Sequence, residues 1–254
     1  MHRFSNVHKT NTEIESLLRS NDIPKKYRWY PFLVSELEAD LSHGIFDRLN
    51  LTIKKNIAYS LQYLEYIDLQ LSELQFSDSL YCMLYKNYII TAAAIVESVF
   101  YHILFYYKKL KYQLYGKPIL HDVKTYKEGE KTFVKVEGHK EKLNSPKEAV
   151  QDFHFLIISV LEGNYLNITD SKVARSYISY CKELRKRVHL HLNQEAWTSD
   201  YHIFSHKEYA LVRYVLYRIL SDPLFGREKQ LIFPELEQES LNVIIKNRYN
   251  YNNG

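Results

Sequence analysis

The fold is decided by the stretch Tyr88-Ile89-Ile90-Thr91-Ala92-Ala93-Ala94-Ile95-Val96-Glu97-Ser98-Val99. It belongs to a segment, 80–110, that is apolar nearly all round, which is typical of a helix contacted by other helices on several sides. The segment is about as long as a transmembrane helix, but Glu97 and His102 lie near its middle, and charged groups at mid-span are costly. We therefore expect a buried core helix and no membrane span.

Working outward, helix signals occur on both sides of this segment. Apolar residues recur every three or four positions from Ile53 to Leu74, and Ser77-Asp78-Ser79 is a plausible cap for the central helix. Ser145-Pro146-Lys147-Glu148 and Ser205-His206-Lys207-Glu208 have the form of capping boxes, and each predicts a helix start, the second helix running to about 220. The inner faces expected for the helices after 145 and after Thr169-Asp170 are Val150, Phe153, Ile157, Val160 and Leu161, then Val173, Tyr177, Cys181, Leu184 and Val188.

A different pattern interrupts the helices between residues 116 and 144. Val123–Tyr126 and Lys131–Val136 alternate apolar and polar residues around Lys127-Glu128-Gly129-Glu130, which predicts a small β-hairpin. An isolated hairpin is marginally stable, so we expect it to lean on the helical body or on a partner.

Composition agrees with a helical fold. The chain contains only 7 Gly and 6 Pro in 254 residues, too few for the many tight turns of an all-β fold. We therefore predict an all-α fold, a helical bundle with a small β-hairpin insertion at about 116–144. The expected organisation is an N-terminal helical extension (1–50), the helical domain (51–222) and a C-terminal tail (223–254).

The net charge and the cysteine content indicate which partners the protein could bind and in which cellular compartment it is expected. The net charge of +4 permits an acidic partner such as RNA. Two cysteines form no disulfide framework, and the N-terminus lacks the apolar core of a signal peptide. These features predict a cytoplasmic protein.

The strongest functional signal is the basic segment Arg185-Lys186-Arg187-Val188-His189-Leu190-His191 at the end of an expected helix. RNA is cleaved without a metal when a base takes the 2′-hydroxyl proton and a cation stabilises the pentacoordinate phosphorane. Histidine suits the proton transfer and arginine suits the phosphate. Because residues six apart on a helix point in different directions, the helix must end or bend between Arg185 and His191. A basic helix end also interacts well with the helix dipole, which is the alternative role.

The segment resembles the R-x4-6-H motif of HEPN proteins, a superfamily of helical bundles, and 88–99 looks like the early helix of that family with its embedded acidic residue. The resemblance covers roughly residues 53–220. It implies a metal-independent endoribonuclease of bacterial phage defence or a toxin–antitoxin system, acting as a homodimer and needing no cofactor or metal. It further implies that Arg185 contacts the scissile phosphate and His191 transfers the proton, with Glu97, Lys186, Arg187 and His189 in support. The implied partners are RNA and an antitoxin or defence-system protein.

Other functions remain open at this stage. Arg185 and Glu97 could form an ion pair for stability alone, leaving a non-catalytic helical module that binds RNA or protein. A metal-dependent phosphohydrolase is a third function, suggested by His121-Asp122 or by His202 and His206 at helix-ligand spacing. His121 is expected in a loop, and Ser205 is expected to start a helix that separates the other pair.

Overall fold

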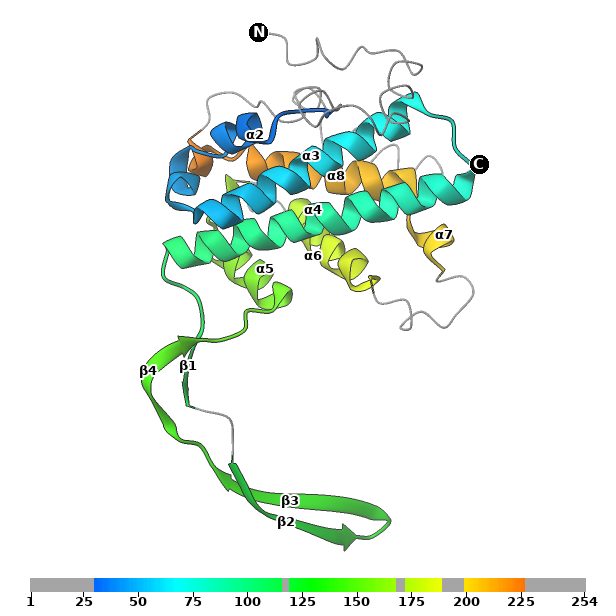
Figure 1. Ribbon diagram of the computed structural model, residues 1–254. Helices are drawn as coiled ribbons and strands as arrows, with labels where there is room; N and C mark the ends of the chain where they lie inside the picture. The colour runs from blue at the N-terminus through cyan, green and yellow to red at the C-terminus, as the bar shows by residue number, and fades with distance from the viewer. Residues whose placement is uncertain (1–29, 116–118, 168–171, 189–198, 227–254) are drawn as a thin grey trace, which may run out of the picture.

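The structure is a computed structural model that describes residues 30–115, 119–167, 172–188 and 199–226. These residues form a helical body from which an arm of β-strands projects (Figure 1). The body comprises α2 (Val34–Asp40), the 3₁₀-helix η3 (Gly44–Arg48), α3 (Leu51–Glu73), α4 (Asp78–Tyr106), α5 (Phe153–Glu162), α6 (Lys172–Lys186), α7 (Asp200–Ile203), α8 (His206–Leu220) and the 3₁₀-helix η7 (Pro223–Phe225).

The central position predicted for the segment 80–110 is confirmed. α4 runs across the whole body, and it packs against α3 and α8 as well as against α5, α6 and α7 (Figure 1). By length and composition α4 is apolar enough to cross a membrane, and 61% of its most apolar 18-residue window is buried inside the protein. Most of its apolar surface is therefore covered by the other helices.

The helix starts follow from local capping. Asn50 caps α3 by accepting a hydrogen bond from the Thr52 N–H at 2.8 Å. The predicted capping box before α8 is present, because Ser205 and Glu208 satisfy each other's backbone N–H groups. α8 ends as predicted, with Asp222 accepting from the Leu224 N–H at 3.0 Å.

The expectation of an all-α fold is wrong, because the insertion is a larger β-structure than one hairpin. β1 (Tyr112–Tyr115) pairs with β4 (Lys142–Glu148), and β2 (Ile119–Glu128) pairs with β3 (Lys131–His139), both antiparallel. The described part of the chain is mostly helical, with two small two-stranded sheets. The β1–β4 pair, which lies next to the helical body, was not predicted because its strands lie far apart in the sequence and neither alternates clearly.

The predicted hairpin itself is confirmed as β2 and β3. Glu128 pairs with Lys131 at the closed end, and Gly129 adopts φ +64° in the turn. This is the left-handed region, which glycine enters without steric cost.

The helix start predicted at Ser145 is also wrong. Residues 142–148 are β4, in which Lys147 pairs with Gln113 of β1. α5 begins only after Asp152, whose side chain accepts from the Phe155 N–H at 2.8 Å. Val150, expected on the inner face of that helix, is 97% exposed. The serine, proline and glutamate of a capping box were present, but strand pairing with β1 determines the local structure.

The described parts of both flanking segments pack into the body. Phe46 of η3 stacks on Phe225 of η7 at a centroid distance of 4.4 Å, and it lies 5.9 Å from the ring of His102 in α4. His102 is buried, and its Nε2 is 2.8 Å from the carbonyl oxygen of Ile45. Burial lowers the pKa of His102, with the Ile45 hydrogen bond opposing that shift. This histidine has a structural role.

Candidate functional site

The site is built on the end of α6, where Arg185 meets the central helix. Arg185 Nη2 lies 2.5 Å from Glu97 Oε2, and the side chains are 39% and 25% exposed, respectively. The guanidinium carbon also lies 5.5 Å from the centre of the Phe153 ring in α5. Three helices thus fix one arginine, because a carboxylate holds its edge and an aromatic ring supports its face.

α6 ends at Lys186, between Arg185 and His191, where the sequence analysis expected the helix to end or bend. The backbone N–H groups of Arg187 and Val188 donate to the carbonyl oxygens of Leu184 and Arg185, both at 3.2 Å, in a tighter turn than an α-helix. Ile178, Cys181 and Leu184 are buried on the inner face of α6. Val188 was expected on that face, but it is 50% exposed because the helix ends at Lys186.

The local electrostatics concern Glu97 most. Burial raises the pKa of the Glu97 carboxyl, and the positive charge of Arg185 opposes that shift only in part. The ion pair with Arg185 therefore offsets only part of the cost of burying the Glu97 carboxylate.

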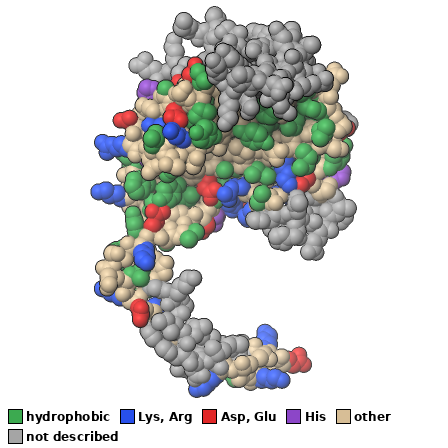
Figure 2. All heavy atoms as spheres, viewed as in Figure 1, with side chains coloured by type: hydrophobic (Ala, Val, Ile, Leu, Met, Phe, Trp, Pro, Cys, Tyr) green, Lys and Arg blue, Asp and Glu red, His purple; other side chains and the backbone are tan. Residues whose placement is uncertain are grey.

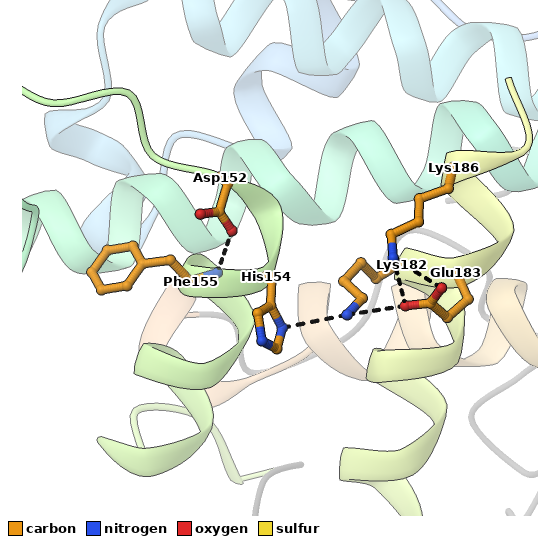
Figure 3. A network of polar contacts seen from close by, with 6 residues as sticks. All are labelled: Asp152, His154, Phe155, Lys182, Glu183 and Lys186. Atoms are coloured by element: carbon orange, nitrogen blue, oxygen red, sulfur yellow. Dashed lines mark hydrogen bonds and ion pairs between the residues drawn. The ribbon is translucent and has the colours of Figure 1, made fainter. Parts of the chain in front are cut away.

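A second polar network covers the face between α5 and α6 (Figure 3). Lys182 Nζ lies 3.0 Å from Glu183 Oε1 and 3.3 Å from His154 Nδ1, while Lys186 Nζ lies 3.0 Å from Glu183 Oε2. Hydrogen bonds from Lys182 and Lys186 lower the pKa of Glu183. Two lysines therefore converge on one carboxylate, with His154 exposed beside them.

The predicted residues divide into three groups. The structure brings Arg185 and Glu97 together. Lys186 is 61% exposed and pairs with Glu183, and Arg187 is half-buried in the turn after α6. His189 and His191 lie outside the described residues.

Three residues of this face were missed from the sequence: His154, Lys182 and Glu183. Lys182 could have been found, because it lies three and four positions before Arg185 and Lys186 and therefore shares their helix face. His154 carries no local signal, since its place near Lys182 depends on how α5 packs against α6.

Within the described ranges, no group of three or more His, Cys, Asp or Glu residues could hold a metal ion. His202 lies in α7 and His206 opens α8, so the two belong to separate helices as predicted. His121 lies in β2 rather than in the loop that was expected.

The arrangement around Arg185 can bind a phosphate. An arginine has five N–H donors in a planar fork, and Glu97 occupies one edge of it. The remaining donors of a side chain that is 39% exposed can contact a phosphate oxygen.

Comparison with protein-family models, with curated proteins and with solved structures finds no match to this chain. The resemblance to HEPN proteins therefore rests on the residues quoted above.

Proposed function

We propose that this protein is a metal-independent endoribonuclease of HEPN type, with Arg185 as the phosphate-binding residue. The observation that carries the proposal is the contact of 2.5 Å between Arg185 and Glu97 at the point where α6 ends. The motif alone is a weak indication of a ribonuclease. A motif whose arginine is also oriented by a carboxylate is a more specific one.

In the proposed reaction the 2′-hydroxyl of the RNA is the nucleophile. His191 takes its proton, the 2′-oxygen bonds to phosphorus, and the bond between phosphorus and the 5′-oxygen of the next nucleotide breaks. The leaving 5′-oxygen takes a proton from water, and His191 later returns its proton to solvent. Arg185 stabilises the negative charge on the non-bridging phosphate oxygens, and Glu97 keeps the guanidinium oriented before the substrate arrives. The products are a 2′,3′-cyclic phosphate and a 5′-hydroxyl end.

The resemblance supplies the rest of the proposal: a homodimer that acts on RNA in phage defence or a toxin–antitoxin system, together with an antitoxin or defence partner. The lysines beside Arg185 favour an anionic substrate, since Lys186 is 61% exposed and lies on the same side of α6 as the mostly buried Lys182.

A second candidate is a non-catalytic module that binds RNA. The same ion pair favours it, because an arginine already held by Glu97 at 2.5 Å can serve the stability of the bundle. The two functions differ in whether RNA is cut.

The experiment is incubation of a mixed RNA pool with purified protein in EDTA. Cleavage by wild type, with loss in Arg185→Ala and in His191→Ala, supports the ribonuclease. Arg218→Ala and His43→Ala are matched controls, because Arg218 is exposed on α8 and His43 is exposed just before η3. They should cleave as wild type does.

Two other results change the conclusion. RNA that binds to folded wild type and stays intact identifies the binding module. Cleavage that survives both the Arg185 and the His191 substitution removes the site from the reaction.

A further inference from the structure

The positive charge of this protein is concentrated on the arm, defined here as residues 108–115 and 119–148. These residues include ten lysines and six acidic residues, a net charge of +4. That equals the net charge of the whole chain, so all the other residues together sum to zero. Exposed arm lysines include Lys124, Lys127, Lys131, Lys140, Lys142 and Lys147.

The outer half of the arm has little packing of its own. β2 and β3 pack chiefly on each other, and the hairpin projects away from the helices (Figure 1). A two-stranded hairpin is marginally stable in water unless something covers it. Among the described residues the helical body does not cover this hairpin, which leaves its surface open to a partner molecule.

The base of the arm, in contrast, is firmly attached. Tyr101 of α4 donates to Glu148 Oε1 at 2.7 Å, which connects the end of β4 to the central helix. Lys111 and Gln151 exchange two hydrogen bonds, one from the Lys111 N–H at 3.2 Å and one from Gln151 Nε2 at 2.8 Å. These bonds fix the starting direction of the arm relative to α4 and α5.

The surface chemistry of the arm combines charge with aromatic rings. Lysine side chains gather at its tip, with acidic side chains among them (Figure 2). Tyr112, Tyr115 and Tyr126 are 52%, 49% and 50% exposed. The exposed lysines Lys124, Lys127 and Lys131 belong to the same hairpin as Tyr126, so charge and aromatic surface lie on one element.

We propose that the arm is a binding surface for single-stranded RNA, with its lysines on the phosphates and its tyrosines stacking on unpaired bases. Charge selects this partner over a second copy of the chain, because the rest of the protein has no net negative charge to offer. The inference adds an RNA-holding surface to the proposed function and rests on it for the identity of the nucleic acid.

The test uses the full chain and a fluorescent single-stranded 2′-O-methyl oligonucleotide, which lacks the free 2′-hydroxyl needed for cleavage. Its affinity is measured by anisotropy at several salt concentrations. The variant Lys124→Gln, Lys127→Gln, Lys131→Gln should bind about tenfold or more weakly near physiological salt. Its slope of log affinity against log salt should fall by about 2, since each phosphate contact on a single strand contributes about 0.7.

The matched control removes the same charge from the helical body. The variant Lys55→Gln, Lys207→Gln, Arg218→Gln has the same net charge as the arm variant and should stay within about twofold of wild type. Equal weakening of both variants, or no weakening of the arm variant, overturns the proposal. So does an arm variant that loses self-association in sedimentation while its affinity for the oligonucleotide is unchanged.

Failure of this inference is distinguishable from failure of the proposed function. Wild type that binds the oligonucleotide through the arm but leaves ordinary RNA intact refutes the ribonuclease alone. Cleavage of ordinary RNA with unchanged binding by the arm variant refutes the arm alone. Arg185→Ala should abolish cleavage and keep the arm-dependent binding.

Discussion

Arg185 Nη2 lies 2.5 Å from Glu97 Oε2, yet burial still holds the pKa of the Glu97 carboxyl above its ordinary value of 4.5. The free-energy cost of burying the Glu97 carboxylate is therefore larger than the stabilisation it gains from the charge of Arg185. A bundle selected for stability alone gains little from this carboxylate, which is consistent with a role in orienting the arginine.

This imbalance predicts opposite effects for the two partners. Glu97→Gln should leave the free energy of unfolding near neutral pH unchanged or raise it by up to about 1 kcal/mol, because a neutral amide is cheaper to bury. Arg185→Gln should lower it by about 1 kcal/mol, because the half-buried carboxylate loses its partner. Urea denaturation measures both, and equal destabilisation by the two variants would contradict the account.

The same pair predicts a pH dependence. A carboxyl whose pKa is raised in the folded state binds its proton more tightly there, so its contribution to stability falls as pH rises above 4.5 towards the raised value. Arg185→Gln should extend this fall to higher pH, whereas Glu97→Gln should remove it. Denaturation curves between about pH 4 and about pH 8 separate the variants, and parallel profiles would sink the assignment.

The ion pair between Lys86 and Asp200 should behave differently, because it is more deeply buried. Lys86 Nζ lies 2.6 Å from Asp200 Oδ2, and the side chains are only 7% and 19% exposed. Within the described part of the chain, Asp200 Oδ1 has no hydrogen-bond partner. Lys86→Met should therefore lower the free energy of unfolding by about 3 kcal/mol, because it leaves a buried carboxylate unpaired.

A double-mutant cycle with Asp200→Asn checks this prediction. The double variant should be more stable than the sum of the single effects implies, by about 1–3 kcal/mol. Strict additivity in thermal or urea denaturation would show that the two groups do not interact.

Structure that depends on interactions between neighbouring residues could be predicted from the sequence, and structure that depends on distant residues could not. The helices around Ile57 and Val96 were predictable, because apolar spacing and caps act within a few residues. β4 was not, because Ser145 to Glu148 contain a good local helix start and only the distant strand β1 makes them a strand.

The same distinction holds at the site. The contact of Glu97 with Arg185 was foreseen as one alternative, since a lone carboxylate in an apolar helix needs a cation nearby. The network of His154, Lys182 and Glu183 depends on the crossing of α5 and α6. No spacing in the chain encodes that crossing.

Two turns approach each other closely at Gly44, which makes this position sensitive to substitution. Its φ is +56°, and a Cβ there would lie 2.5 Å from the carbonyl oxygen of Leu224. Gly44→Ala should cost about 3 kcal/mol or more, combining left-handed strain with a clash against backbone. Gly129→Ala is the matched control: its φ is +64° but nothing lies within 4 Å. It should leave the thermal unfolding of the helical body unchanged, and a similar loss in both variants would mean that strain alone is measured.

Two buried tyrosines of adjacent helices should respond oppositely to loss of the hydroxyl group. Tyr209 donates to Asp68 Oδ1 at 2.6 Å, and Arg213 Nε lies 3.1 Å from the other carboxylate oxygen. Tyr88 packs edge-on against Tyr209 at 4.8 Å between ring centres, and its buried hydroxyl has no hydrogen-bond partner among the described residues. Tyr209→Phe should therefore cost about 2 kcal/mol, because it breaks a hydrogen bond to a charged group.

Tyr88→Phe keeps the same ring contact and removes only an unsatisfied polar atom, so it should be neutral or stabilise by up to about 1 kcal/mol. The free energy of unfolding from urea titration measures both variants on one scale. If Tyr88→Phe costs as much as Tyr209→Phe, the hydroxyl of Tyr88 has a partner in solution, and the junction of α4 with α8 is more polar than this arrangement implies.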